Sequence, residues 1–236
     1  MIELENIYKV FSTDEIETYA LDGINLKVDR GDFASIMGPS GCGKSTLLNI
    51  IGHLDTPTKG TIRIEGTDTG HMTDKELSRL RNEKFGFIFQ SFHLIPSLNI
   101  LQNVELPMLY SQEKLSAKAV RERAVSIIER VGLVSRMKHF PSQLSGGQCQ
   151  RAAIARAMMA HPHVLLADEP TGNLDSRMGR EIMDLLLELN AEGMTVVMVT
   201  HDATLAAEAS VRVTMNDGKI MDASRGQNNK PNSNEK

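Results

Sequence analysis

Residues 38–46 constrain the fold of this chain more than any other segment. They read Gly-Pro-Ser-Gly-Cys-Gly-Lys-Ser-Thr and match the pattern G-x-x-x-x-G-K-[ST]. The apolar run at 33–37 predicts a buried strand before them, and paired apolar residues at 47–51 predict a helix after them. A strand, a glycine-rich turn and a helix form an anion cradle, because backbone N–H groups and the helix N-terminus point at the ligand. The segment therefore predicts a nucleoside triphosphate site.

The residue types within this segment suit separate parts of a phosphate site. Gly38, Gly41 and Gly43 allow positive φ and close approach of the backbone to phosphate oxygens. Lys44 is expected to neutralise the β- and γ-phosphates. The Ser45 hydroxyl is expected to bind Mg²⁺.

The composition argues against several other classes of protein. The formal net charge is −4 and aromatic residues make up 4% with no Trp, so no nucleic-acid partner is expected. The two cysteines, Cys42 and Cys149, are too few for a disulfide framework, which favours a reducing, cytoplasmic compartment. No stretch approaches the roughly 18 apolar residues of a membrane span, and the N-terminus does not look like a signal peptide. A role at a membrane would then require a partner.

Apolar runs along the chain predict a mostly parallel sheet covered by helices, an α/β fold. Apolar and polar residues roughly alternate at 2–7, 24–28 and 62–64, which predicts strands near the N-terminus, with a long connection at 11–19. Further strands are expected at 85–89, 164–167, 195–199 and 211–215. The last is followed by Asn216, Asp217 and Gly218, which predict a hairpin turn. An amphipathic helix is expected at 178–189.

Two segments differ from this core. Residues 91–160 predict a helical insertion, with apolar residues at helical spacing from Val120 and with Ser116 as an N-cap. Residues 223–236 are almost wholly polar and are expected to form a disordered tail. The chain is thus expected to form one domain over residues 1–222, followed by that tail.

Polar residues follow several of the expected strands. Asp168 and Glu169 follow one apolar run, His201 follows another, and Gln90 follows a third. Ligands of open parallel sheets bind at the carboxyl ends of the strands, so these side chains should meet there. Asp168 can hold Mg²⁺, Glu169 can polarise an attacking water, and Gln90 offers an amide to metal or water.

Residues 144–148, Leu-Ser-Gly-Gly-Gln, open a further predicted helix and allow two interpretations. Ser145 and Gln148 have the spacing of a capping box. The two glycines between them also leave N–H groups free for a second anionic group. The segment alone does not decide between these interpretations.

Taken together, the ordered motifs resemble those of an ABC-transporter nucleotide-binding subunit over residues 1–222. They comprise the phosphate loop, Gln90, residues 144–148, the Asp168–Glu169 strand end, residues 172–175 and His201. Within that family, the sequence segments 36–41, 47–52 and 103–107 resemble those of the MacB/LolD branch. The resemblance implies a P-loop NTPase core of RecA-like type, an antiparallel β subdomain at the N-terminus and an inserted helical signature subdomain.

The resemblance also implies roles for matching residues, with ATP and Mg²⁺ as ligands. Glu169 would be the general base, His201 would contact the γ-phosphate, and Phe11 would stack on adenine with Tyr8 as a rival. The phosphates would be wrapped by Gly38, Pro39, Ser40, Gly41, Cys42, Gly43, Lys44, Ser45 and Thr46. Ser145, Gly146, Gly147 and Gln148 would serve the nucleotide of the other protomer, with Asp175 crossing the interface or capping the next helix. Metal ligands would be Ser45, Gln90 and Asp168.

The partners that the resemblance implies are a second copy of the chain and a membrane permease of MacB/FtsX type. The chain would then lie in the cytoplasm, peripheral to the inner face of the membrane. The permease is expected to contact residues 90–103, where apolar side chains gather. An FtsE-like ATPase that regulates cell division would carry the same motifs and remains an alternative.

Overall fold

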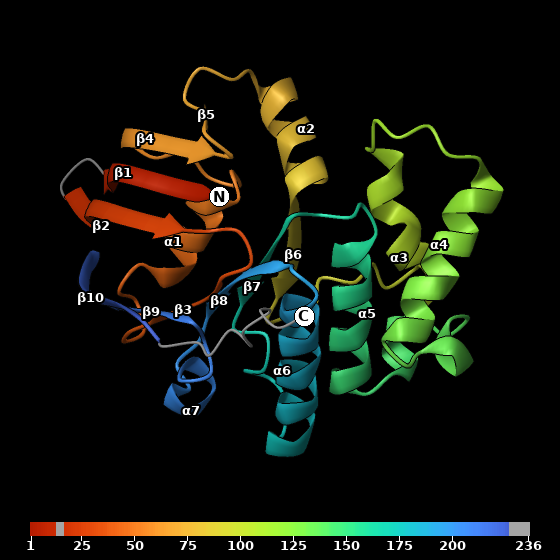
Figure 1. Ribbon diagram of the computed structural model, residues 1–236. Coiled ribbons are helices and arrows are strands. Elements are labelled where there is room, and N and C mark those ends of the chain that lie inside the picture. Colours follow the sequence, from red (N-terminus) through yellow and green to blue (C-terminus); the bar gives the residue numbers. More distant parts are fainter. Residues whose placement is uncertain (13–16, 227–236) are drawn as a thin grey trace, which may run out of the picture.

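The computed structural model describes residues 1–12 and 17–226, and their strands form two sheets (Figure 1). One sheet has the strand order β2-β1-β4-β5, and its paired strands are antiparallel. Its strands are β1 (Ile2–Ser12), β2 (Glu17–Val28), β4 (Lys59–Ile64) and β5 (Thr67–Asp68). The expected antiparallel sheet near the N-terminus is therefore confirmed.

The second sheet has the order β10-β9-β3-β8-β7-β6. All its neighbouring strands are parallel except the β9–β10 hairpin, which confirms the mostly parallel core. Its strands are β3 (Phe33–Met37), β6 (Phe85–Phe89), β7 (Val164–Asp168), β8 (Thr195–Val199), β9 (Val211–Asn216) and β10 (Lys219–Arg225). Asp217 and Gly218 in the β9–β10 turn both have positive φ, and the hairpin turn that the sequence predicted is confirmed.

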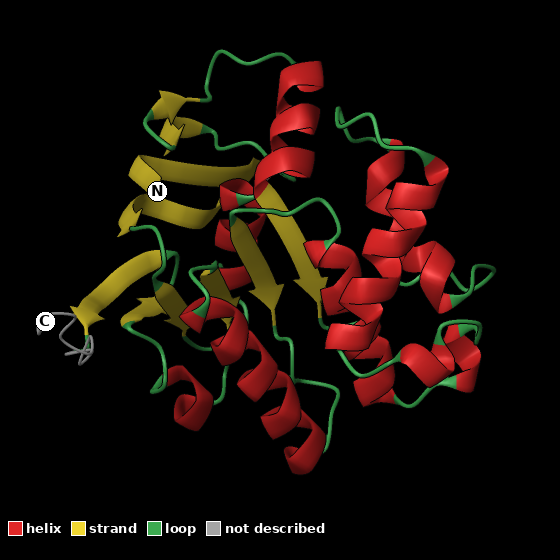
Figure 2. Cartoon of the chain, turned by 45° about the vertical axis from the view of Figure 1, so that its right-hand side comes forward, coloured by secondary structure: helices red, strands yellow, loops and turns green. Residues whose placement is uncertain are grey.

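Helices cover this sheet and form a separate group beside it (Figure 2). The α-helices are α1 (Lys44–Ile51), α2 (Asp74–Lys84), α3 (Ile100–Glu105), α4 (Ala117–Arg130), α5 (Gly146–Met158), α6 (Ser176–Ala191) and α7 (Ala203–Ala206). Short 3₁₀ turns are η1 (Leu106–Leu109), η2 (Val134–Arg136) and η3 (Pro141–Gln143). Residues 91–160 thus contain helices and turns, and Ser116 caps α4 as predicted. Within the described residues, no helix is both long and apolar enough to cross a membrane.

The strands of the parallel sheet bury both faces, and each face belongs to a different core. Leu165 and Ala167 of β7 pack with α3, α4, α5 and α6. Val164 and Leu166, which alternate with them, pack with α1 and the N-terminal sheet. The helix that follows the phosphate loop therefore lies between the two sheets, which fixes the loop at the strand ends.

Two boundaries and one helix differ from the sequence prediction. The expected connection at 11–19 is shorter, because Phe11 pairs with Thr18 and Ser12 with Glu17 in a continued hairpin. The expected tail begins too early, since β10 continues to Arg225, whose guanidinium lies 2.7 Å from Asp29 Oδ2. Residues 227–236 lie outside the described part. Helix α2 was not predicted, because none of its residues is fully buried and only Leu77 and Leu80 supply apolar side chains.

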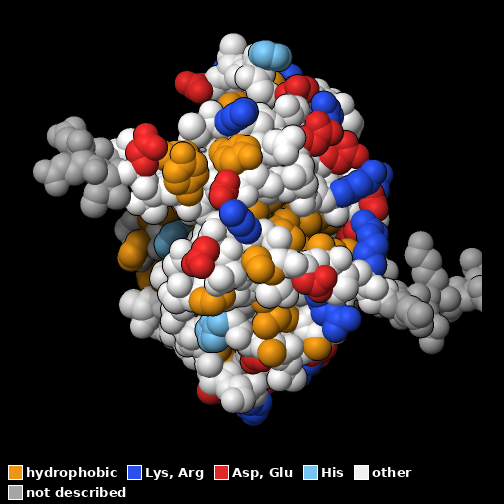
Figure 3. Space-filling view, turned by 90° about the vertical axis from the view of Figure 1, so that its left-hand side faces the viewer, with side chains coloured by type: hydrophobic (Ala, Val, Ile, Leu, Met, Phe, Trp, Pro, Cys, Tyr) orange, Lys and Arg blue, Asp and Glu red, His pale blue; other side chains and the backbone are white. Residues whose placement is uncertain are grey.

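The side of the molecule that carries β1, β2 and β10 shows hydrophobic side chains between charged ones (Figure 3). Each of these strands contributes one large exposed apolar residue, namely Phe11, Tyr19 and Met221. Polar contacts join the β9–β10 hairpin to β2. The Asp22 N–H donates to Gly218 O at 2.9 Å, and Lys219 pairs with Asp22 at 3.1 Å.

Candidate active site at the phosphate loop

The phosphate loop connects β3 to α1 and requires glycine where it touches its neighbours. Gly43 is the N-cap of α1 at φ +100°, and a Cβ there would lie 2.3 Å from Ala20 O in β2. A Cβ on Gly38 would lie 2.2 Å from Met215 O in β9. Gly218 N–H in the β9–β10 turn donates to Cys42 O at 3.1 Å. The loop is therefore held by both sheets.

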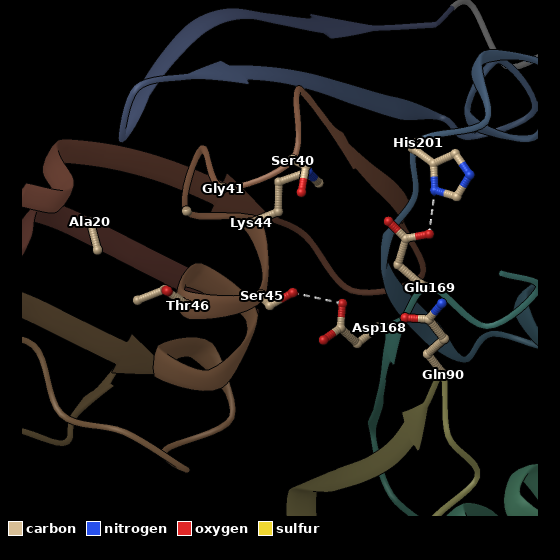
Figure 4. A pocket seen from close by; sticks show the side chains of 11 residues that line it. Ala20, Ser40, Gly41, Lys44, Ser45, Thr46, Gln90, Asp168, Glu169 and His201 are labelled. Carbon is tan, nitrogen blue, oxygen red and sulfur yellow. Dashed lines mark hydrogen bonds and ion pairs between the residues drawn. The ribbon is translucent and has the colours of Figure 1, made fainter.

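A cavity of about 440 Å³ opens at this loop (Figure 4). Its walls come from β2, the phosphate loop, and the ends of β6, β7 and β8. The lining residues are Ala20, Ser40, Gly41, Gly43, Lys44, Ser45, Thr46, Gln90, Asp168, Glu169 and His201. The structure thus brings together the residues that the sequence predicted at the strand ends. Cys42 is buried and does not line the cavity.

Lys44 is oriented by the loop that it belongs to. Its side chain is largely buried, and Nζ donates to Gly38 O at 2.8 Å and to Pro39 O at 2.7 Å. The remaining contact is Cys42 Sγ at 4.0 Å, which is a weak acceptor. One of the three N–H donors is therefore available for an anion in the cavity.

Ser45 and Asp168 face each other across the cavity. Ser45 Oγ donates to Asp168 Oδ1 at 3.0 Å (Figure 4). Burial raises the pKa of Asp168, and the adjacent Glu169 carboxylate raises it further, while the Ser45 hydrogen bond and Lys44 oppose the rise. A desolvated carboxylate beside another carboxylate is an unfavourable arrangement that a cation relieves.

The donor set around Asp168 fits Mg²⁺. A hydroxyl and one carboxylate supply the oxygen ligands that this ion prefers, and it usually keeps waters and takes substrate phosphates for the rest. Ser45 and Asp168 are therefore the residues that would hold the ion.

Glu169 directly follows β7 and has an unusual backbone. Its φ is +49°, in the left-handed region that side-chain-bearing residues rarely adopt. The conformation is held because its N–H donates to Val199 O and its carbonyl accepts from Gly172 N–H, both at 3.0 Å. His201 Nδ1 donates to Glu169 Oε2 at 2.5 Å, since a carboxylate only accepts. Oε1 of Glu169 then remains as the acceptor toward the cavity.

Gln90 is held by a residue that the sequence argument gave no separate role. Its Nε2 donates to Asn173 Oδ1 at 3.3 Å, and Asn173 Nδ2 donates to the Gln90 carbonyl at 3.0 Å. The amide nitrogen of Gln90 is thus engaged and its carbonyl oxygen Oε1 is left for a ligand. The β6–β7–β8 register explains the placement, because Phe89, Asp168 and Val199 lie side by side where these strands end.

The residues of segment 144–148 lie at a different place from the cavity. Ser145 caps α5, with Gln148 N–H donating to its Oγ and Gln148 Oε1 accepting from its N–H, so the capping box is confirmed. Asp175 likewise caps α6 through Met178 N–H at 2.9 Å. In the described part of the chain, residues 144–148 are not among those that line the phosphate-loop cavity. Asp175 and His201 both line a second cavity, which has a volume of about 390 Å³.

Comparison with known proteins identifies the family. A family model described as ABC transporter matches residues 21–172. The chain belongs to the ABC transporter family. It is 50% identical over 222 residues to an uncharacterized ABC transporter ATP-binding protein of Methanocaldococcus jannaschii, covering 94% of this chain and 98% of that protein. The predicted family, and with it an ATPase domain, is confirmed.

Two further relatives bear on the branch and on the fold. The chain is 48% identical over 220 residues to the macrolide export ATP-binding/permease protein MacB of Rhodopseudomonas palustris, covering 93% of this chain and 33% of that protein. It therefore spans about a third of that relative. A dimeric structure of the ATP-binding cassette MJ0796 of Methanocaldococcus jannaschii, in a post-hydrolysis state bound to ADP and Pi, superposes with a TM-score of 0.89 at 45% identity. That match covers 95% of this chain and 98% of the other.

The adenine-stacking residue of this ABC ATPase stays a prediction. Phe11 is 49% exposed near the end of β1, next to the connection to β2, with Lys9 Nζ 5.1 Å from its ring centroid. The rival Tyr8 is partly buried, lies against Gly23 and has Lys59 Nζ 5.6 Å from its ring centroid. Phe11 pairs with Thr18, two residues from the cavity-lining Ala20, so the register favours Phe11.

Sequence reasoning missed three supports of the site. Ala20 lines the cavity, Asn173 holds Gln90, and the Gly218 N–H binds the phosphate loop. Ala20 and Gly218 act through backbone atoms or through position, which no side-chain pattern reveals. Asn173 had a usable signal, because it lies between Gly172 and Asp175 in a segment already singled out.

Proposed function

We propose that this chain is the ATP-hydrolysing subunit of an ABC transporter, which pairs head to tail with a second copy around two ATP molecules and drives a membrane permease of MacB/FtsX type. One observation carries the hydrolytic part of this proposal. The Glu169 carboxylate, fixed by His201, and the phosphate loop face the same cavity. A base and an anion cradle in one cavity suit attack by water on a bound γ-phosphate.

The chemistry follows from the atoms that remain free. Glu169 Oε1 orients a water and takes its proton as the oxygen bonds to the γ-phosphorus. The bond from the γ-phosphorus to the bridging oxygen then breaks, leaving ADP and phosphate. The free N–H of Lys44 and the backbone N–H groups at the start of α1 stabilise the charge on the phosphates. His201 keeps the Glu169 carboxylate in place, and a contact between His201 and the γ-phosphate remains part of the proposal.

Mg²⁺ completes this proposal as the cofactor, held by Ser45 and Asp168, with Gln90 Oε1 in reach of the same cavity. When bound, it neutralises charge on the phosphate oxygens. Ser45 and Asp168 already face each other at 3.0 Å, so their part of the site is preformed.

Dimerisation is supported by the separation of the two motifs in one chain. Residues 144–148 form a capped helix start with glycine N–H groups, which suits an anion, yet within the described residues they do not line this chain's own cavity. A second copy placed head to tail would bring its α5 N-terminus to that cavity. The dimeric state of the related MJ0796 cassette supports this arrangement.

The hydrolytic role is tested by Glu169→Gln. This change keeps size and polarity but removes the base, whose contribution to rate is typically ~10²–10⁴. Steady-state ATPase activity should fall by at least about 10² while the dissociation constant for ATP stays unchanged. The exposed Glu188 of α6 provides the matched control, because Glu188→Gln makes the same substitution away from the cavity. ATPase activity of Glu169→Gln equal to that of the control would reject the assignment.

The permease is proposed to dock at a groove beside the predicted segment 90–103. This groove has a volume of about 590 Å³ and lies between α2, β6, η1 and α5. Its lining includes Phe87, Phe89, His93 and Tyr110, and Tyr110 is 75% exposed. Aromatic side chains in a concave surface with an exposed rim suit an apolar segment of another protein. Of the segment itself, Ile100 and Leu101 are buried in the core and are not available. Such docking would hold the chain at the cytoplasmic face of the membrane.

Substitution at the rim tests this docking site. Tyr110→Glu introduces a charge at an exposed position, so the fold should be retained and binding to the permease lost. Met221→Glu is the control, since Met221 is also an exposed apolar residue, 64% accessible, and lies on β10, which does not line the groove. Copurification from detergent-solubilised membranes, followed by identification of the permease, measures the outcome. Equal recovery of the permease with both variants would reject the groove as its site.

A further inference from the structure

Gln150 is a buried polar residue that the proposed reaction does not use. It lies one turn into α5, is fully buried, and its Nε2 donates to Pro170 O at 2.8 Å. Among the described residues its Oε1 has no hydrogen-bond partner. A buried amide with one orphaned oxygen is costly, so its single hydrogen bond needs an explanation beyond packing.

The acceptor of this hydrogen bond is the carbonyl of Pro170, the residue that follows Glu169. A residue that precedes proline is sterically restricted, and Glu169 in addition has φ +49°. Strained backbone persists only where neighbours over-determine it. Proline has no N–H, so the carbonyl is the only backbone group by which Pro170 can be hydrogen-bonded. Gln150 supplies the donor for that carbonyl.

The helix that carries Gln150 also packs against residues further along the chain after Pro170, up to the start of α6. A Cβ on Gly147 would lie 2.7 Å from Met178 Sδ, and a Cβ on Gly146 would lie 3.2 Å from Leu174 Cδ2. The start of α5 is thus in close contact with residues 174–178. Movement of α5 would be transmitted to Pro170 through the Gln150 amide.

We infer that Gln150 is a positioning residue for hydrolysis, which holds Pro170 and thereby keeps the Glu169 carboxylate aligned with the attacking water. This inference rests on the proposed role of Glu169 as the base. It also links α5 to Glu169, the proposed general base of this chain's own site. Helix α5 begins with the residues that are proposed to face the nucleotide of the second copy. Misplacing a catalytic group by about 1 Å costs up to ~10²-fold in rate.

The test uses Gln150→Met, which keeps the length of the side chain and removes both the donor and the orphaned oxygen. Losing the hydrogen bond destabilises the fold, while losing the orphaned oxygen stabilises it, so Tm should stay within about 4 °C of the parent. We expect kcat to fall by roughly 10- to 100-fold and the dissociation constant for ATP to stay within about twofold, because Gln150 does not line the phosphate-loop cavity. Gln150→Leu provides a second variant with the same readouts should Gln150→Met fail to fold.

Asn190 of α6 is the matched control. Its Nδ2 also donates to backbone carbonyls, Gly31 O at 3.0 Å and Met194 O at 2.7 Å, outside the residues that line the cavity. Asn190→Leu should lower Tm and leave kcat unchanged. A fall of kcat in Asn190→Leu as large as in Gln150→Met would assign the effect to general loss of stability and overturn the inference.

A double variant separates positioning of the base from other damage. In a Glu169→Gln background there is no base to align, so adding Gln150→Met should leave the residual single-turnover rate unchanged. An equal fold-loss in both backgrounds, or wild-type kcat for Gln150→Met alone, would overturn the inference. If Glu169→Gln itself hydrolyses ATP normally, the proposed base fails instead, and the two failures are thereby distinguished.

Discussion

Lys44→Ala is the substitution for which the structure gives the most specific expectation. Two of the three N–H donors of Lys44 are committed to Gly38 O and Pro39 O, which leaves one for phosphate. A hydrogen bond to a charged group contributes roughly 1.5–3 kcal/mol. Losing one such bond corresponds to a dissociation constant for ATP that is about 10- to 150-fold higher. The two carbonyls left behind belong to the loop, and water entering the cavity can satisfy them, so the chain should remain folded.

The measurement is isothermal titration with ATP, performed both with Mg²⁺ and with EDTA. Lys44→Ala should weaken binding in both conditions, because its ammonium acts on phosphate directly. Ser45→Ala is the control variant, since its hydroxyl is assigned to the cation through Asp168 and should matter only with Mg²⁺. A dissociation constant for Lys44→Ala within twofold of wild type in EDTA would refute the assignment of its free N–H to phosphate.

Three further predictions concern stability, measured by chemical unfolding of the nucleotide-free chain. Asp168→Asn should raise the free energy of unfolding at pH 8 and lose that advantage as pH falls toward 4, because the pKa of Asp168 is raised by burial and its ionised form is disfavoured in the fold. His53→Gln should flatten the loss of stability below about pH 6.5, because burial lowers the pKa of His53 and the unfolded chain takes up the proton first. Gly43→Ala should cost several kcal/mol more than Gly41→Ala, since both have positive φ but only Gly43 lies against Ala20 O.

Each of these expectations has a result that would contradict it. Asp168→Asn less stable than wild type at pH 8 would mean that the Ser45 and Lys44 contacts outweigh burial. An unchanged pH dependence in His53→Gln would show that its imidazole, which contacts Ile51 O and Thr69 Oγ1, is not the group that titrates. If both glycine substitutions lowered the free energy of unfolding by the same amount, the contact with β2 would not be the reason for glycine at position 43.

The strands and the site were predictable where burial leaves a pattern. The parallel strands are continuous apolar runs because helices or sheets cover both faces, and their ends position Gln90, Asp168, Glu169 and His201. The capping residues were equally predictable, since a hydroxyl or carboxylate before a helix has a local hydrogen-bonding reason.

The parts that were missed bury few side chains or depend on backbone atoms. Helix α2 buries none of its residues, although its Thr73–Glu76 capping box was present in the sequence. The β1–β2 hairpin continues through Phe11 and Ser12, both of which are exposed, so this end of the strand has no buried face that a sequence pattern could reveal. The contact between Gly218 N–H and Cys42 O joins backbone atoms far apart in the chain, and it depends on the packing of two sheets. Sequence patterns carry little information about contacts of that kind.

The claim that the site is completed by a second copy is tested most directly by the mass of the Glu169→Gln variant in solution. Light scattering during gel filtration should give the mass of one chain without nucleotide and twice that mass with ATP and Mg²⁺. Glu188→Gln, which retains the base, should form far less of this dimer because it hydrolyses its ATP. A Glu169→Gln chain that binds ATP with full affinity and still elutes at the mass of one chain would contradict the account.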